Sequence, residues 1–130
     1  MKTKKRPTSL PALRKKAWAA FSVHIRSGAA LHNGGAFCVT CNAFAPWAEL
    51  HAGHFVHCSK QSPLSYDERN VHPQCRQCNY YGMQGEAMIH YTAFMQANYG
   101  PGIVNELLAI KHAKNYLKRA DLEAIIERYK

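Results

Sequence analysis

The spacing of hydrophobic residues predicts helices at both ends of the chain. In residues 10–27 an apolar side chain recurs every four positions, at Leu13, Ala17 and Phe21. This spacing places all three on one face of a helix. Thr8 or Ser9 can cap that helix, and Pro11 falls in its first turn, where proline is tolerated. Residues 1–9 show no such pattern, and we expect them to form a disordered basic arm.

A second helical region is predicted over residues 81–130. Its first half carries apolar side chains at helical spacing, a pattern more typical of a core than of a functional stripe, at Met88, Tyr91 and Met95. Gly100 and Pro101 end that helix. Residues 102–130 are expected to form a helical tail, with Asp121 as the N-cap of its last helix.

The centre of the chain shows no helical period. Residues 49–56 can form a short strand, and residues 57–69 are rich in serine and are expected to form a loop. Pro73 keeps residues 70–74 extended, because proline disfavours a helical conformation at the residue before it. We therefore expect one α+β domain over residues 10–130, with a helix on each side of a small central core.

Four of the five cysteines form two Cys-x-x-Cys pairs with 33 residues between them: Cys38, Cys41, Cys75 and Cys78. Four thiolates can close a tetrahedron around Zn²⁺, and such sites are normally structural because no position stays open for water. A redox pair would not need a second copy, and an odd number of cysteines argues against a disulfide framework. We expect a structural zinc ion within a core of residues 36–98, with Cys58 as a half-buried small residue.

The net charge of +9 is concentrated near the N-terminus. Residues 1–48 carry eight Lys or Arg and no Asp or Glu, whereas the remaining residues nearly balance. Such a region suits nucleic acid, although an anionic membrane surface would also attract it and a solubilising tail would look the same. No apolar stretch reaches the about 20 residues of a membrane span. No apolar segment follows the basic N-terminus, so a secretory signal is not expected either.

Four of the eight histidines lie between the two cysteine pairs: His51, His54, His57 and His72. The thiolates already complete a zinc site, so these histidines point to a second function; for any single one, a surface or loop position is an equal alternative. A cysteine pair, a strand histidine, Asn70, a second cysteine pair and Asn79 follow one another in the order of the zinc-supported HNH, or ββα-metal, nucleases, which the chain resembles. The resemblance implies that His54 activates water and that Asn70 orients the His54 ring. It also implies that Asn79 binds one divalent ion at the start of a helix.

Three motifs extend this resemblance: Ala-Gly-His-Phe at 52–55, Asn-Val-His-Pro-Gln-Cys at 70–75 and Cys-Asn at 78–79. With Gly85 and Tyr91 they resemble the NinG, or Rap, family of phage recombination proteins over roughly residues 12–130. The order of the second cysteine pair and Asn79 is also similar to phage endonuclease VII, a junction resolvase. The resemblance implies a structure-specific endonuclease that cuts branched recombination intermediates, such as D-loops and four-way junctions. It also implies a phage or prophage protein of the bacterial cytoplasm.

One position departs from the HNH pattern. Most such sites have a metal-binding Asp before the histidine, and here that position is Gly53. His72, His51 or Glu86 could supply the ligand instead, and His54 itself could bind the ion. Amide oxygen suits Mg²⁺, whereas an imidazole ligand favours Mn²⁺. We expect one catalytic Mg²⁺ or Mn²⁺ beside the structural zinc.

The expected DNA contacts are basic side chains on the arm, on the first helix and beside the proposed site: Lys4, Lys5, Arg6, Arg14, Lys15, Lys16, Arg69 and Arg76. Contacts to phosphates set affinity but not sequence preference. The expected partners are branched DNA, a second copy of the chain and other recombination proteins, with no membrane. Two alternatives stay open: an HNH nuclease that cuts ordinary duplex, and a non-catalytic zinc module that binds nucleic acid.

Overall fold

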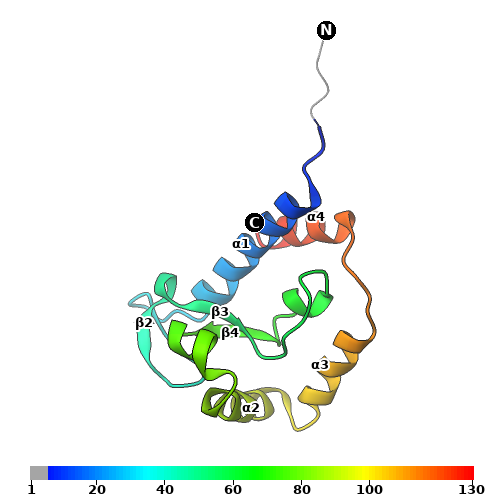
Figure 1. Ribbon diagram of the computed structural model, residues 1–130. Coiled ribbons are helices and arrows are strands. Elements are labelled where there is room, and N and C mark those ends of the chain that lie inside the picture. Colours follow the sequence, from blue (N-terminus) through cyan, green and yellow to red (C-terminus); the bar gives the residue numbers. More distant parts are fainter. Residues whose placement is uncertain (1–5) are drawn as a thin grey trace.

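The computed structural model describes residues 6–130 and shows a mixed α+β fold (Figure 1). In this part of the chain the α-helices are α1 (Leu10–Gly28), α2 (Glu86–Tyr99), α3 (Ile103–His112) and α4 (Arg119–Arg128). The strands form two antiparallel hairpins: β1 (Gly35–Phe37) with β2 (Phe44–Pro46), and β3 (His51–His54) with β4 (Val71–Gln74). The predicted α+β class is therefore confirmed.

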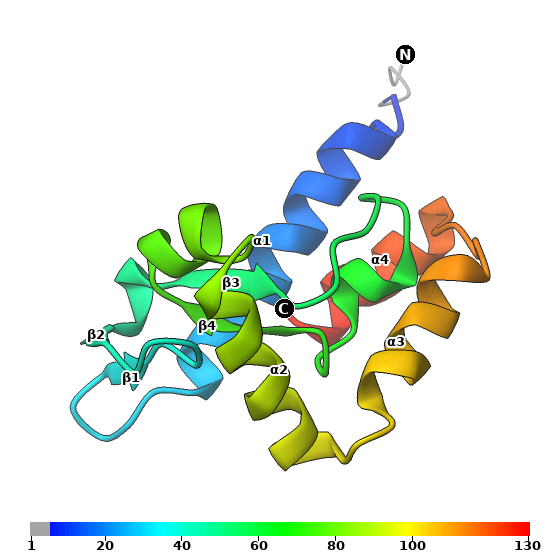
Figure 2. The same cartoon turned by 60° about the horizontal axis from the view of Figure 1, so that its bottom comes forward.

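The β3–β4 hairpin lies between two helical layers. In Figure 1, α1 and α4 lie side by side on one side of the hairpin, with α2 and α3 on the other. Figure 2 shows the same arrangement with α2 and α3 brought forward. The first and last helices of the chain thus form one layer, and the hairpin is covered on both faces.

The predicted N-terminal helix is confirmed, and its sequence pattern explains how it packs. The Ser9 side chain caps it by accepting a hydrogen bond from the Ala12 backbone N–H at 3.3 Å. The buried face of α1 has two contact regions. In its first part, Leu13 and Ala17 pack against Leu122 of α4. One turn further, Phe21 packs against Ala52 of β3 and Val71 of β4. These contacts fix α1 across the hairpin.

The other face of the hairpin carries the larger core. Tyr91, Met95 and Leu107 are fully buried there, together with Phe55 and Leu64 from the segment between β3 and β4. The Tyr91 hydroxyl donates a hydrogen bond to the Gly53 carbonyl of β3 at 2.7 Å. The helical spacing of Tyr91 and Met95 therefore marks core positions, as the sequence indicated.

Several boundaries differ from the sequence predictions. The helix expected from residue 81 begins at Glu86, because residues 78–82 form a π-helical turn that follows the second cysteine pair. The last helix is capped at Lys118, and Asp121 is not its N-cap. Asp121 instead lies three residues into the capping box, where its carboxylate accepts a hydrogen bond from the Lys118 backbone N–H at 2.7 Å.

The basic arm lies only partly within the described structure. Residues 1–5 are outside it, and residues 6–9 belong to no helix or strand. The disorder predicted for the arm therefore stays a prediction. Within residues 6–130, every helix falls short of the length and apolar character needed to cross a membrane.

Candidate metal centre and nucleic-acid cleft

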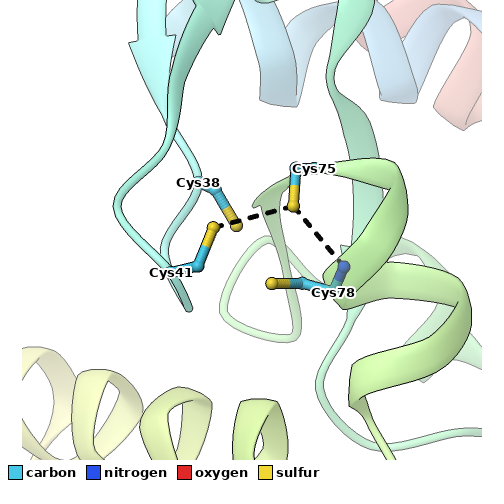
Figure 3. A group of neighbouring side chains, drawn as sticks. All are labelled: Cys38, Cys41, Cys75 and Cys78. Atoms are coloured by element: carbon cyan, nitrogen blue, oxygen red, sulfur yellow. Dashed lines mark hydrogen bonds between the residues drawn. The ribbon is translucent and has the colours of Figure 1, made fainter.

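The four cysteines of the two pairs converge, as their spacing predicted (Figure 3). Their sulfur atoms all lie within 4.8 Å of one another, and the Sγ atoms of Cys41 and Cys75 are 3.7 Å apart. A tetrahedral zinc ion with Zn–S bonds of about 2.3 Å places its sulfur ligands about 3.8 Å apart. The donor set and its spacing therefore fit a structural Zn²⁺.

The ionisation of the cluster also favours a cation. Burial raises the pKa of Cys38, but hydrogen bonds from Thr40 and from nearby backbone amides outweigh this and lower it to about 6. Burial and the neighbouring cysteines raise the pKa of Cys78 to about 12. The site thus holds the Cys38 thiolate readily, whereas ionisation of Cys78 is unfavourable without a compensating positive charge.

The cluster ties the first hairpin to the second. Cys38 follows β1 directly, and the Val39 backbone N–H donates to the Pro73 carbonyl of β4 at 3.0 Å. Cys75 follows β4, and Cys78 begins the π-helical turn. A metal held here would fix both hairpins and the turn in one unit, next to the core that Cys38 and Cys78 share with α2.

His54, the predicted base, lies at the end of β3 against the first helix. Its ring stacks on Trp18 with 5.1 Å between ring centroids. Its Nε2 atom is 3.1 Å from the Ser65 carbonyl oxygen. A carbonyl can only accept, so Nε2 carries the proton and the neutral ring leaves Nδ1 as a free acceptor. Among the described residues no hydrogen-bond partner occupies Nδ1, so its lone pair is unused within the fold.

The surroundings of His54 keep it neutral and attract anions. Burial lowers its pKa below the usual 6.5, and the charge of nearby His57 lowers it further, against a raising effect of the Ser65 carbonyl. A cleft of about 560 Å³ adjoins the ring, and its lining includes Arg14, Lys15 and Lys60. This cleft, the His54 cleft, offers cationic side chains and no carboxylate.

Within the described residues, the Asn70 side chain makes no hydrogen bond to His54, contrary to its expected orienting role. It is fully buried, and its amide bonds instead to the loop between β3 and β4: to the Val56 backbone N–H at 2.8 Å, the Val56 carbonyl at 3.0 Å and the Leu64 carbonyl at 3.2 Å. Leu64 precedes Ser65, whose carbonyl holds His54. Asn70 therefore acts on the histidine only through the loop that it closes.

His51 and Asn79 do meet. The Asn79 amide lies 3.1 Å from His51 Nδ1, although Asn79 is in the π-helical turn and not on the helix where it was expected. Neighbouring strand positions alternate between faces, so His51 and His54 project from opposite faces of β3. The described residues thus join the two predicted metal ligands but keep them out of contact with the predicted base.

His72 loses its place as a candidate metal ligand. Its Nδ1 is 3.1 Å from the Tyr91 hydroxyl and its Nε2 is 2.8 Å from the Tyr99 hydroxyl. Burial lowers its pKa to about 4, so the ring is neutral. The Tyr91 hydroxyl donates to the Gly53 carbonyl, so His72 Nδ1 donates to the Tyr91 oxygen. The one lone pair of the neutral ring, on Nε2, accepts from the Tyr99 hydroxyl and is not free for an ion. Glu86, a further candidate, is exposed and lies 3.8 Å from His90.

The space at Gly53 is already filled. A Cβ atom there would lie 1.8 Å from the Gln74 Oε1 atom, so the Gln74 side chain occupies the volume that an aspartate would need. Gln74 is fully buried, and its Oε1 has no hydrogen-bond partner among the described residues. Outside the four cysteines, no group of three or more His, Cys, Asp or Glu within residues 6–130 could hold a metal. A catalytic ion therefore fits only in part, through His51 and Asn79.

The structure places the predicted DNA-binding residues in different surroundings. Arg14 and Lys15 line the His54 cleft, while Lys16 and Arg6 are exposed elsewhere. Arg76 is exposed and lies over the Tyr80 ring at 5.9 Å. Arg69 is a correction: Asp67 and Glu106 bind its guanidinium at 2.9 and 3.2 Å, so it is neutralised within the fold. Lys4 and Lys5 lie outside the described residues.

Three residues of the cleft escaped the sequence analysis. Trp18 stacks on His54, a contact between α1 and β3 that helical spacing does not mark. Lys60 was part of a loop with no pattern, and it lines the cleft. The Ser65 carbonyl is a backbone group that no side-chain pattern can mark. In the sequence, a single lysine in a serine-rich loop was the one sign of the cleft at these three positions.

The comparisons with known proteins agree with the resemblance seen in the motifs. The family model of the bacteriophage lambda NinG protein matches residues 2–130. A search of curated proteins and a search of solved structures each found no match. The match covers nearly the whole length, including both cysteine pairs and the His54 cleft, and the chain therefore belongs to the family of the bacteriophage lambda NinG protein.

Proposed function

We propose that this protein is a metal-dependent endonuclease that cuts branched DNA, such as D-loops and four-way junctions. The observation that carries the proposal is the His54 cleft: a neutral, oriented imidazole beside cationic side chains. The resemblance to HNH nucleases implies the same role for this histidine, and the order β3–β4–α2 beside a four-cysteine cluster is compatible with a ββα-metal core.

The residues of the cleft suit phosphodiester hydrolysis. A phosphate bound by Arg14, Lys15 and Lys60 is placed beside His54. The free Nδ1 accepts a proton from water, while the Ser65 carbonyl keeps the other ring nitrogen protonated. Trp18 covers one face of the ring and fixes its plane. The chain itself thus binds, orients and supplies the base.

His51 and Asn79 are the residues that would hold a divalent ion. Asn79 can present its amide oxygen to an ion after rotation of the amide, with His51 Nδ1 as a second donor 3.1 Å from the amide. A bound ion would supply positive charge to a phosphate on the face of β3 that carries His51, opposite the face that carries His54. A mixed nitrogen and oxygen donor set favours Mn²⁺ over Mg²⁺.

A second function has its own supporting observation. Gln74 fills the place of the usual aspartate, and the described residues offer no carboxylate in the His54 cleft. A zinc-stabilised module that binds branched DNA without cutting would have the same cysteine cluster and the same basic cleft. Cutting activity separates the two functions.

The test compares a labelled four-way junction, a D-loop and a plain duplex, with Mn²⁺, with Mg²⁺ and with no added divalent ion. The zinc-loaded wild-type chain is expected to cut the branched forms only when an ion is added. His54→Ala is expected to lower the rate by about 100- to 10,000-fold, the usual contribution of a general base, while DNA binding persists. His32→Ala, at an exposed histidine that does not line the cleft, is the matched control and should cut normally.

The pH dependence gives an independent check. The base acts in its neutral form, so the rate should rise with pH through the pKa of His54, which lies below the usual 6.5, and then level off. Unchanged cutting by His54→Ala would move the base elsewhere. Binding of branched DNA without cutting under either ion would leave the non-catalytic module.

A further inference from the structure

Two tyrosines of the π-helical turn are left in solvent beside the metal centre. Tyr80 and Tyr81 are 63% and 70% exposed, and their ring centroids are 6.3 Å apart. The Arg76 guanidinium lies over the Tyr80 ring at 5.9 Å, and the edge of His51 approaches that ring at 5.1 Å between centroids. We call Tyr80, Tyr81 and Arg76 the aromatic platform.

The position of the platform is fixed, so its exposure is not that of a loose loop. Cys78 begins the turn and belongs to the zinc cluster, and the Asn79 backbone N–H donates to the Cys75 carbonyl at 3.0 Å. π-Helical turns are rare and are frequently found at functional sites. Exposed aromatic rings lower solubility, which favours a role in binding for these two. Because the turn already holds the rings in place, little conformational entropy is lost when a partner stacks on them.

The chemistry of the platform matches one kind of partner. Unpaired bases stack on exposed aromatic rings regardless of sequence, and an arginine beside the rings contacts the phosphates or adds a cation–π contact. A paired base inside a duplex cannot reach such a ring, because its faces are covered by its neighbours in the stack. A protein partner would match the rings but would give no reason for the basic net charge of +9.

We propose that the aromatic platform stacks on unpaired bases of DNA and thereby recognises the branch. This proposal rests on the DNA substrate of the proposed function. It adds that unpaired bases are the feature by which the protein recognises that substrate. His51 at one end of β3 adjoins the platform, and His54 at the other end adjoins the cleft. His51 and His54 project from opposite faces of β3, so a DNA chain that reaches both the platform and the cleft must pass around an edge of the hairpin.

The test measures binding in a His54→Ala background, so that cutting does not interfere. The probes are a forked DNA with unpaired arms and a fully paired duplex of equal length, with 2-aminopurine in one arm of the fork. The parent chain should prefer the fork and quench the 2-aminopurine fluorescence on binding. Replacing both rings, Tyr80→Ala with Tyr81→Ala, should reduce the preference for the fork about 5- to 100-fold. The duplex affinity and the salt dependence should change little, because the phosphate contacts remain.

Two controls separate stacking from other effects. Tyr80→Phe with Tyr81→Phe keeps both rings and should keep the preference, whereas Ile89→Ala removes an exposed apolar side chain from α2 and should have no effect. Both tyrosines are exposed, so the double alanine variant should retain its zinc and its fold. An unchanged preference for the fork, or no quenching in the parent chain, would overturn the proposal. A clear preference for the fork without any cutting by wild type would sustain the platform while refuting the nuclease.

Discussion

Asn70→Ala tests how the fold holds the candidate base. The side chain is fully buried and makes three hydrogen bonds to the loop between β3 and β4. Each bond contributes about 1 kcal/mol net, and more where a buried partner is left unpaired, so we expect the free energy of unfolding to fall by about 3 kcal/mol. A small domain has only about 5–15 kcal/mol in total. Urea unfolding of the zinc-loaded protein measures the loss as a lower midpoint at unchanged slope.

The matched control is Asn98→Ala. Asn98 is exposed and makes one side-chain bond, to the Phe94 carbonyl at 2.8 Å, so its loss should change stability by no more than about 0.5 kcal/mol. Asn70→Ala should also slow cutting under conditions where it stays folded, because the Ser65 carbonyl that orients His54 follows the loop. A stability loss below about 1 kcal/mol would refute the view that this amide closes the loop.

A variant at the same position supplies a pH test. Asn70→Asp keeps the acceptor for the Val56 N–H but directs a second oxygen at the Val56 and Leu64 carbonyls. The protonated carboxyl can donate there and the ionised one cannot, so the folded-state pKa of this Asp should rise above its unfolded value of about 3.9. Stability relative to wild type should therefore fall as pH rises from about 3.9 to the raised folded-state pKa, and a flat difference would contradict the hydrogen-bond directions.

Two further substitutions test the metal centre and the space beside β3. Cys75→Ser should release zinc, as measured by metal analysis, and unfold the central region, because one of the four thiolates is lost; a folded variant that keeps one zinc per chain would disprove the four-cysteine site. Gly53→Ala should destabilise the fold by about 1–3 kcal/mol, since its Cβ would lie 1.8 Å from the Gln74 oxygen. The double variant with Gln74→Ala should be less destabilised than the sum of the two single changes, and strict additivity would show that these residues do not compete for space.

The sequence predicted the parts of the structure that depend on local patterns. Helical spacing located α1 and the buried face of α2, and Ser9 caps α1 as its position indicated. Each Cys-x-x-Cys pair brings its own two sulfurs together locally, and the spacing predicted the shared cluster that the fold then forms from the two pairs. The family followed from short motifs, and the family model matches residues 2–130.

The boundaries that failed depend on competition between neighbours. The second cysteine pair leads into a π-helical turn, so α2 begins at Glu86 and Asn79 precedes it. Asp121 is a residue type that can be an N-cap, but here Lys118 is the N-cap. The hydrogen bond from the Lys118 backbone N–H to the Asp121 carboxylate fixes this choice. Such choices turn on single hydrogen bonds that a sequence pattern does not resolve.

The site shows most clearly what the chain determines alone and what only the folded structure decides. The sequence identified a strand histidine, the asparagine at position 70, basic residues on the first helix and four cysteines. Only tertiary packing brings α1 onto β3, so that Trp18 and Arg14 meet His54, and only the loop between the strands presents the Ser65 carbonyl to that ring. The same packing commits His72 to two tyrosines and Arg69 to two carboxylates. The physical reason is that spacing along a chain fixes which residues share a face, whereas a side chain's free lone pair or free charge depends on partners that are distant in sequence.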